Sequence, residues 1–249
     1  KEEVSFDYMD LQDYNAFHVE SDDKNMFDKD LQNQWLFKYN KKDEYSVEYI
    51  EAFYFPNKFK TVVIPTLYEV HKGMNGLETA LDEMVKSIEK EVDKGANIVL
   101  LTDRGVSNYF APIPMLMACS HTHNAFKRLK KRSNFGIVIE SAEPREPHHF
   151  SCLFGYGASA INPYMVNEII EDQVESGNIK GITAEVAIDN FNQAIAKGIV
   201  KVMNKIGIST LHSYRGAQIF EALGLSEKYV DQFFCDTTTR IEGIGLYEI

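Results

Sequence analysis

The sequence has few cysteines, and their spacing excludes the commonest cysteine-based sites. Cys119, Cys152 and Cys235 are the three cysteines of a 249-residue chain, and no CxxC pair is present. Zinc ribbons and iron–sulfur clusters need closely spaced cysteines, so neither motif occurs in this chain. Two of the three cysteines fall in apolar stretches with helical spacing. We expect buried, reduced thiols, which are typical of a cytoplasmic protein.

The chain also lacks long apolar runs and an apolar leader. No stretch of about 18 apolar residues occurs, which argues against a membrane-spanning helix and a membrane partner. The first four residues, Lys-Glu-Glu-Val, contain neither a starting Met nor the beginning of a signal peptide. We therefore expect a piece of a longer protein or an expressed fragment.

Positive charge is scarce. The chain has 26 Lys and Arg against 37 Asp and Glu, a formal net charge of −11, which argues against a nucleic-acid partner because phosphate binding requires basic residues. The one basic cluster, at residues 127–132, is typical of a helix C-terminus, where cations complement the helix dipole. A hydrophobic content of 44% and a charged content of 25% fit one large α/β domain or two small ones.

Residues 1–58 show no regular period. They are acidic but carry many aromatic residues, which disordered segments lack: Phe6, Tyr8, Tyr14, Phe17, Trp35, Phe37 and Tyr39. We expect an irregular N-terminal segment packed on a main domain that spans residues 59–249.

From residue 60 onward, short runs rich in β-branched residues alternate with apolar stretches of helical spacing. The pattern predicts strands at 60–65, 98–102, 135–140, 158–161 and 208–212. It predicts helices at 77–94, 115–130, 147–154, 164–173, 183–206, 217–222 and 227–233, and a C-terminal tail from 237. About five strands are too few for a closed eight-stranded barrel. The predicted fold is α/β: a partial or distorted (β/α) barrel-like domain with parallel strands, or an open parallel sheet.

Charged residues gather where two of these strands end. Asp103 and Arg104 leave one strand, and Glu140 and Glu143 leave the next. Ligand-handling groups lie at the carboxyl ends of parallel strands, so these four are candidate site residues, with the two glutamates able to divide acid and base roles. The structural alternative is a salt-bridged loop, in which Asp103 caps a turn and Arg104 pairs with Glu140 or Glu143.

His148 and His149 are further candidates, and with the pair His121 and His123 they raise the question of a metal. Two ligands on one helix face need a spacing of three or four residues, which none of these pairs has. His148 and His149 also fall in the first turn of a predicted helix, where the helix dipole disfavours a protonated ring. We expect neutral, hydrogen-bonded side chains and no metal site.

Tyr214 and Arg215 follow the last predicted strand, where the next helix N-terminus could bind an anion. No GxGxxG or Walker-type phosphate loop accompanies them. A helix-opening turn is the plainer interpretation.

Several of these stretches, in this order, resemble the central domain of the glutamate synthase large subunit. The motifs are Leu-Thr-Asp-Arg-Gly-Val at 101–106, Ala-Pro-Ile-Pro at 111–114, Glu-Ser-Ala-Glu-Pro-Arg-Glu at 140–146, His-His-Phe at 148–150, Gly-Tyr-Gly-Ala at 155–158, Ile-Asn-Pro-Tyr at 161–164, the run from Lys-Gly at 197–198 to Ser-Thr at 209–210, Ser-Tyr-Arg-Gly-Ala-Gln-Ile-Phe-Glu-Ala at 213–222, and Thr-Arg-Ile at 239–241 with the glycine at 243. The resemblance covers about residues 59–249, and residues 1–58 match little.

This resemblance implies a multidomain oxidoreductase that converts L-glutamine and 2-oxoglutarate into two L-glutamates. An amidotransferase domain with an N-terminal cysteine releases ammonia, and an FMN-binding barrel with an iron–sulfur cluster consumes it. The central domain, a (β/α)-barrel-like relic, links the two as partners in one polypeptide and helps form the ammonia tunnel. By resemblance, this chain is that linking domain, without catalytic, cofactor-binding or metal-binding residues of its own.

Two alternatives from other classes remain open on the residues alone. One is a free-standing (β/α) enzyme that uses the residues at the strand ends, and a stoichiometric bound metal would favour it. The other is a regulatory module that binds a small molecule such as glutamine, 2-oxoglutarate or a flavin.

Overall fold

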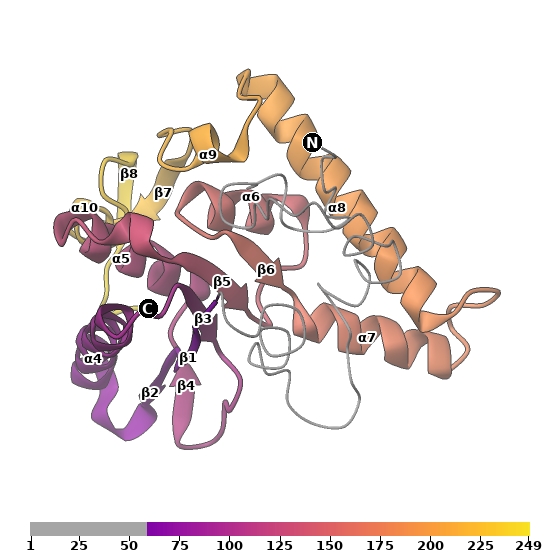
Figure 1. The fold of residues 1–249 in the computed structure, drawn as a ribbon, viewed down its shortest axis with the longest axis horizontal. Coiled ribbons are helices and arrows are strands. Elements are labelled where there is room, and N and C mark those ends of the chain that lie inside the picture. Colours follow the sequence, from indigo (N-terminus) through magenta and orange to yellow (C-terminus); the bar gives the residue numbers. More distant parts are fainter. Residues whose placement is uncertain (1–58) are drawn as a thin grey trace.

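The computed structural model describes residues 59–249, which form a parallel sheet with helices on one side and a long helical hairpin at one end (Figure 1). The predicted N-terminal segment, residues 1–58, lies outside the described residues. The elements are, in chain order, β1 (Thr61–Pro65), β2 (Leu67–Glu69), the 3₁₀ helix η2 (Val70–Lys72), α4 (Gly73–Asp93), β3 (Ile98–Thr102), β4 (Phe110–Pro112), α5 (Met115–Arg128), the 3₁₀ helix η3 (Arg132–Asn134), β5 (Gly136–Glu140), α6 (Pro147–Gly155), β6 (Ala160–Asn162), α7 (Tyr164–Glu175), α8 (Ala184–Ile206), α9 (Leu211–Tyr214), β7 (Glu221–Leu225), α10 (Glu227–Phe233) and β8 (Thr238–Ile244).

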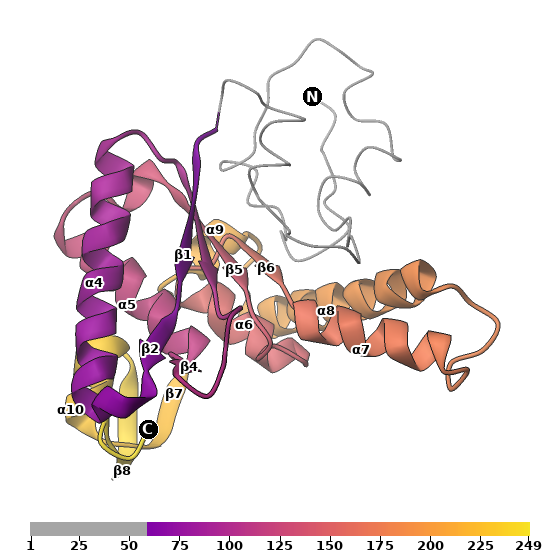
Figure 2. The same cartoon turned by 90° about the horizontal axis from the view of Figure 1, so that it is seen from below.

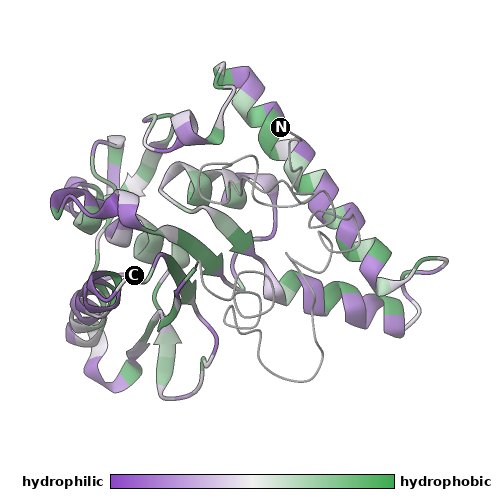
Figure 3. Ribbon diagram, in the orientation of Figure 1, coloured by the Kyte–Doolittle hydropathy of each residue, from purple (hydrophilic) through white to green (hydrophobic). Residues whose placement is uncertain are grey.

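The central sheet has the strand order β1-β3-β5-β6, and every pair in it is parallel. Its register aligns the last residues of the strands, so that Pro65 lies opposite Thr102, Thr102 opposite Glu140, and Glu140 opposite Asn162. All five residues of β3 are buried, which explains why the strand is a continuous apolar run rather than an alternating one. Figure 3 shows the central strands as hydrophobic. The aligned strand ends bring their polar residues to one edge.

Helices α4, α5 and α6 connect successive strands of this sheet and cover the same face. Helix α4 packs on β1 and α5 on β5, while α4 contacts α5 and α5 contacts α6 (Figure 2). Strands that neighbour one another in chain order, with their connecting helices side by side, are the arrangement of a (β/α) barrel. With four strands in the central sheet of residues 59–249, the barrel is partial, as the sequence predicts.

Local signals in the sequence account for the ends of the longest helix. The Thr183 side chain accepts a hydrogen bond from the Val186 N–H and caps the start of α8. Gly207, with φ of 81°, provides the left-handed residue that ends it. Helix α5 ends at Arg128 with Lys127 in its last turn, which confirms the prediction for the basic cluster. Helices α7 and α8 pack against each other and extend away from the sheet in both views (Figures 1 and 2).

Three sequence predictions are wrong, and two strands are missing from the predicted set. Residues 208–212 are not a strand, because the Thr210 hydroxyl accepts the Ser213 N–H and starts the short helix α9. Residues 221–225 form β7 rather than a helix and a turn, since they pair in parallel with β8, which the sequence presents as a tail. Strands β2 and β4, an antiparallel pair, are not among the predicted strands. Cys119 is buried, but Cys152 and Cys235 are only partly buried; all three are free thiols.

No helix within residues 59–249 is both long enough and apolar enough to cross a membrane.

Candidate functional site

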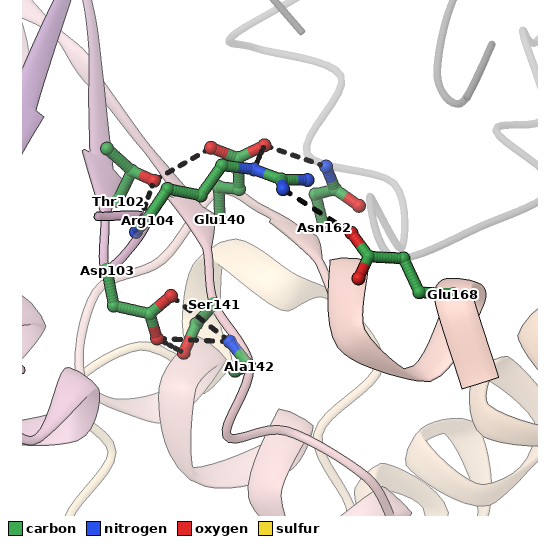
Figure 4. A network of polar contacts seen from close by, with 8 residues as sticks. All are labelled: Thr102, Asp103, Arg104, Glu140, Ser141, Ala142, Asn162 and Glu168. Atoms are coloured by element: carbon green, nitrogen blue, oxygen red, sulfur yellow. Dashed lines mark hydrogen bonds and ion pairs between the residues drawn. The ribbon is translucent and has the colours of Figure 1, made fainter. Parts of the chain in front are cut away.

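The carboxyl edge of the central sheet gathers a network of polar side chains from β3, β5, β6 and α7 (Figure 4). At its centre is Glu140, the last residue of β5, which is 3% exposed. One carboxylate oxygen accepts the Thr102 hydroxyl at 2.8 Å, and the other accepts the Asn162 side-chain amide at 3.4 Å. A buried carboxylate needs such partners, because an unpaired charge in the interior is strongly unfavourable.

Arg104 supplies the charge that balances Glu140. Its Nε lies 3.0 Å from Glu140 Oε1, and its Nη1 lies 3.4 Å from Glu168 Oε1 on α7. The guanidinium also covers the Tyr164 ring, with Cζ 3.8 Å from the ring centroid. Burial alone would lower the pKa of Arg104, but the two carboxylates raise it on balance. The cation therefore links β3, β5 and α7.

Asp103, which is 2% exposed, turns away from this cation toward the β5–α6 loop. One of its carboxylate oxygens accepts the Ser141 hydroxyl at 2.6 Å and the Ala142 N–H at 3.0 Å. Figure 4 shows the two carboxylates, Asp103 and Glu140, held by separate sets of partners. The structural interpretation of the sequence is therefore confirmed in both parts: Asp103 caps a turn, and Arg104 pairs with Glu140.

Glu143 caps the start of helix α5, as Asp103 caps the β5–α6 loop. Both of its carboxylate oxygens accept the Met115 N–H, at 3.0 and 3.1 Å, at a helix start that has no cap from its own residue Pro114. The residue is exposed overall, but its carboxyl group lies against the helix, and loss of solvent there raises its pKa more than the Met115 N–H lowers it. Glu143 thus joins the β5–α6 loop to α5.

The histidine candidates lie apart from this network, in the first turn of α6. His149 Nδ1 accepts the Arg145 N–H at 3.1 Å, while its Nε2 lies 3.4 Å from a Glu146 oxygen. His148 Nε2 lies 3.6 Å from Cys152 Sγ, one helical turn later. Both residues are exposed, and the His148 ring also lies edge to face with Phe220, with ring centroids 6.0 Å apart. Among residues 59–249, no group of three or more His, Cys, Asp or Glu side chains is placed to hold a metal ion.

Tyr214 and Arg215 lie at the opposite, amino edge of the sheet. Tyr214 is fully buried at the end of α9, and Arg215 Nε donates to the Ala158 carbonyl oxygen at 3.1 Å, just before β6. Arg215 lines a cleft of about 560 Å³, along with His123, Arg132, Ser159 and the first residues of β3 and β5. The prediction that these two residues leave a strand is wrong, because Tyr214 is the last residue of the helix α9 and Arg215 follows that helix. The eight candidates therefore occupy three places rather than one.

Sequence reasoning missed five members of the carboxyl-edge network. Thr102 and Asn162 end their strands, and Ser141 follows β5, so their positions at strand ends are a signal that was available. Tyr164 and Glu168 are four residues apart on α7, and the spacing that puts both on one helix face is a second signal. The pKa of the Tyr164 hydroxyl is raised, mainly by burial and to a smaller extent by the nearby Asp103 carboxylate. Every side chain of the network has a hydrogen-bond or ion-pair partner inside the fold, which favours a structural clamp over chemistry.

The family model described as "Glutamate synthase central domain" matches residues 26–226. The chain belongs to this family. The match begins within the N-terminal segment and ends before β8, so it reaches further toward the N-terminus, and less far toward the C-terminus, than the sequence motifs indicated.

Curated relatives agree with this family. The chain is 39% identical over 202 residues to "Glutamate synthase [NADPH] large chain" of Bacillus subtilis, covering 80% of this chain and 13% of that protein. It is 39% identical to "Glutamate synthase [NADH]" of Schizosaccharomyces pombe (77% of this chain, 9% of that protein) and 37% identical to "Ferredoxin-dependent glutamate synthase 2" of Synechocystis (75% and 13%). The chain thus spans about a tenth of the length of these relatives.

Among solved structures, a flavocytochrome b2 variant with bound sulfite aligns with a TM-score of 0.41 at 12% identity, over 73% of this chain and 46% of that one.

Proposed function

We propose that this chain is the central domain of a glutamate synthase and that it links the two half-reactions of a larger polypeptide. The parent protein would release ammonia from L-glutamine in an amidotransferase domain. It would use that ammonia to form L-glutamate from 2-oxoglutarate in a domain carrying FMN and an iron–sulfur cluster. Residues 59–249 would form the body of the linking domain, preceded by residues 1–58, and would help to enclose the path of the ammonia. We place the parent protein in the cytoplasm.

The observation that carries this proposal is the family match over residues 26–226 together with the state of the carboxyl edge. In a (β/α) barrel enzyme that edge holds the reacting groups. Here Glu140 and Arg104 neutralise each other, and Asp103 and Glu143 accept hydrogen bonds from the Ala142 and Met115 N–H groups. Charged side chains that already have ion-pair or hydrogen-bond partners inside the fold support a scaffold rather than a reaction centre.

The proposal is tested in the full-length parent protein, by following its two sources of ammonia separately. We expect Arg104→Met, which loosens β3 from α7, to lower glutamine-dependent glutamate formation several-fold. Glutamate formation from added ammonium, and glutamine hydrolysis itself, should stay near the unmodified rates. Glu146→Gln, an exposed change on the same side, is the matched control. A parallel loss of the ammonium-dependent rate would show that the domain takes part in the chemistry and would contradict the proposal.

A second measurement uses this chain alone. The proposal places the flavin in another domain, so the purified 249-residue chain should carry no flavin absorbance and show no saturable thermal shift with FMN. Stoichiometric FMN on this chain would overturn the assignment of a noncatalytic domain.

A further inference from the structure

The central sheet has a second face, which is turned away from helices α4, α5 and α6. Side chains in register across parallel strands point to the same side of a sheet, and successive residues of a strand alternate between the sides. The rows that contain Val62 and Ile64 belong to the core beneath those helices. The row between them points the other way and is entirely apolar: Val63, Leu100, Val138 and Ala160. None of these four belongs to that core of residues 59–249, and we call their side of the sheet the inner face.

The centre of the inner face is shielded from solvent. Leu100 and Ala160 are 3% and 8% exposed, whereas Val63, on the outermost strand β1, is 41% exposed. Ile98, in the next inner row toward the amino edge, is 9% exposed. Parallel sheets occur with both faces covered. The cover of the inner face has to come from outside α4, α5 and α6, because these helices pack on the opposite side.

We propose that residues 26–58 of this chain cover the inner face. The family match starts at residue 26, so these residues belong to one domain with the sheet. Covering an apolar face requires large apolar side chains, and nine of these 33 residues are aromatic: Phe27, Trp35, Phe37, Tyr39, Tyr45, Tyr49, Phe53, Tyr54 and Phe55. The inference is independent of the activity proposed above, since it concerns only how this chain completes its own sheet.

The chain meets the sheet at the place that this arrangement needs. Strand β1 begins at Thr61, so residue 58 is joined to the sheet at its amino edge. The cleft of about 560 Å³ at that edge is lined by Phe59 together with Ile98 and Val138 of the inner face. The cleft therefore continues the inner face to the residue that directly follows the proposed cover. Four strands about 4.8 Å apart make a face about 15 Å wide, which a segment of this length can cross.

Photo-crosslinking in the 249-residue chain tests the assignment. A benzophenone amino acid in place of Val63 should crosslink to peptides from residues 26–58, which mass spectrometry identifies. The same group in place of Leu129 is the matched control, because Leu129 is also 41% exposed but follows helix α5 on the opposite side of the sheet. The control should give about tenfold fewer crosslinks to these residues, since only side chains in contact react. Equal yields from both positions, or crosslinks from position 63 to residues 59–249 alone, would overturn the inference.

Trp35 provides an independent measurement, because it is the one tryptophan of the chain and lies within residues 26–58. We expect acrylamide to quench its fluorescence several-fold less in the folded chain than in urea. Val63→Asp places a charge on the inner face and should raise the quenching about twofold or more, whereas Leu129→Asp should leave it unchanged. Equal quenching of the folded and the urea-unfolded chain would contradict the proposal.

Crosslinking from position 63 in the full-length parent protein separates the other possible occupants of the face. We again expect crosslinks to residues 26–58. Crosslinks to a domain outside residues 1–249 would assign the inner face to that domain, and crosslinks between two copies of the 249-residue chain would assign it to a second copy. Either result would overturn the inference. Neither result depends on whether the parent protein forms glutamate, so a failure of the proposed function would be recognised separately.

Discussion

At the scale of single residues, the buried Glu140 side chain has Arg104 as its ion-pair partner. We expect Arg104→Ala to lower the free energy of unfolding by about 2–3 kcal/mol, somewhat less than for a fully buried pair because Arg104 is partly exposed. Urea denaturation of the 249-residue chain measures this. Glu168→Gln removes only the outer partner of Arg104 and should cost less than about 1 kcal/mol. Equal losses for the two variants would contradict the central position of Glu140.

His123 makes stability depend on pH. Burial, together with the nearby Arg132, lowers its pKa from 6.5 to about 3, and its Nδ1 accepts the Arg132 Nε–H. Below pH 6.5 the unfolded chain binds a proton that the folded chain does not, so stability falls as the pH is lowered toward 3. Between pH 7 and 5 we expect His123→Gln to reduce this loss by about 1–2 kcal/mol, measured by denaturation at each pH. Identical pH profiles would show that folding does not change the pKa of His123.

The side chain of His123 also leaves no room for a residue larger than glycine at position 157. It has a φ of 124°, and a Cβ there would lie 2.6 Å from His123 Nδ1. Gly157→Ala should destabilise the chain by about 1–3 kcal/mol through strain and this collision together. Gly177→Ala separates the two causes, because Gly177 also has a positive φ, 76°, with open space around its Cβ position. Thermal melting of both variants should show the larger loss for Gly157.

At the scale of elements, helix α8 contains a polar residue that its packing does not satisfy. Asn192 is 1% exposed, and neither its Oδ1 nor its Nδ2 has a hydrogen-bond partner in the described part of the chain. Asn192→Leu should therefore raise the free energy of unfolding by about 1–2 kcal/mol. Asn124→Leu is the contrasting variant, since Asn124 Nδ2 donates to Ser120 Oγ and the Phe233 carbonyl oxygen, and it should destabilise. A destabilised Asn192→Leu would indicate a partner such as a bound water.

The sequence predicts elements well where the residues of the element carry a local signal. Strand β3 and helix α10 have the expected bounds because one is a buried apolar run and the other starts at Ser226, whose side chain accepts the Tyr229 N–H. The sequence does not predict strand β7, because residues 221–225 contain no β-branched or aromatic residue that would favour a strand. Its strand conformation comes from pairing with β8, more than ten residues later. Pairing of this kind leaves no pattern in the residues of the strand itself from which the strand could be predicted.

The candidate site was predictable for the same reason that the central sheet was. Strands β3 and β5 are adjacent and in register, so their ends meet. Glu140 ends β5, and Asp103, Arg104 and Glu143 follow shortly after one or the other of these strands. Arg215 could not be placed in this way. Its position at the amino edge depends on a contact with Ala158, 57 residues earlier in the chain.

At the scale of the whole molecule, the hairpin of α7 and α8 projects from the sheet, and its connecting residues are exposed (Figure 2). Lys180 lies in this connection. Among residues 59–249, we expect trypsin to cut first after Lys180, because exposed loop tips are the preferred sites of proteolysis. Mass spectrometry of a short digest locates the cut, and Lys180→Ala should abolish it. An earlier cut within α4 or α5 would show that the sheet-covering helices open more readily than the hairpin.

The strand order of the central sheet also bears on how the protein is made. Each new strand adds beside the strand that came before it in the sheet, β3 on β1, β5 on β3 and β6 on β5. No later strand has to insert between two earlier ones. As the chain leaves the ribosome, each strand therefore finds its partner already synthesised, and the half-barrel can assemble from its first strand to its last before β7 and β8 emerge.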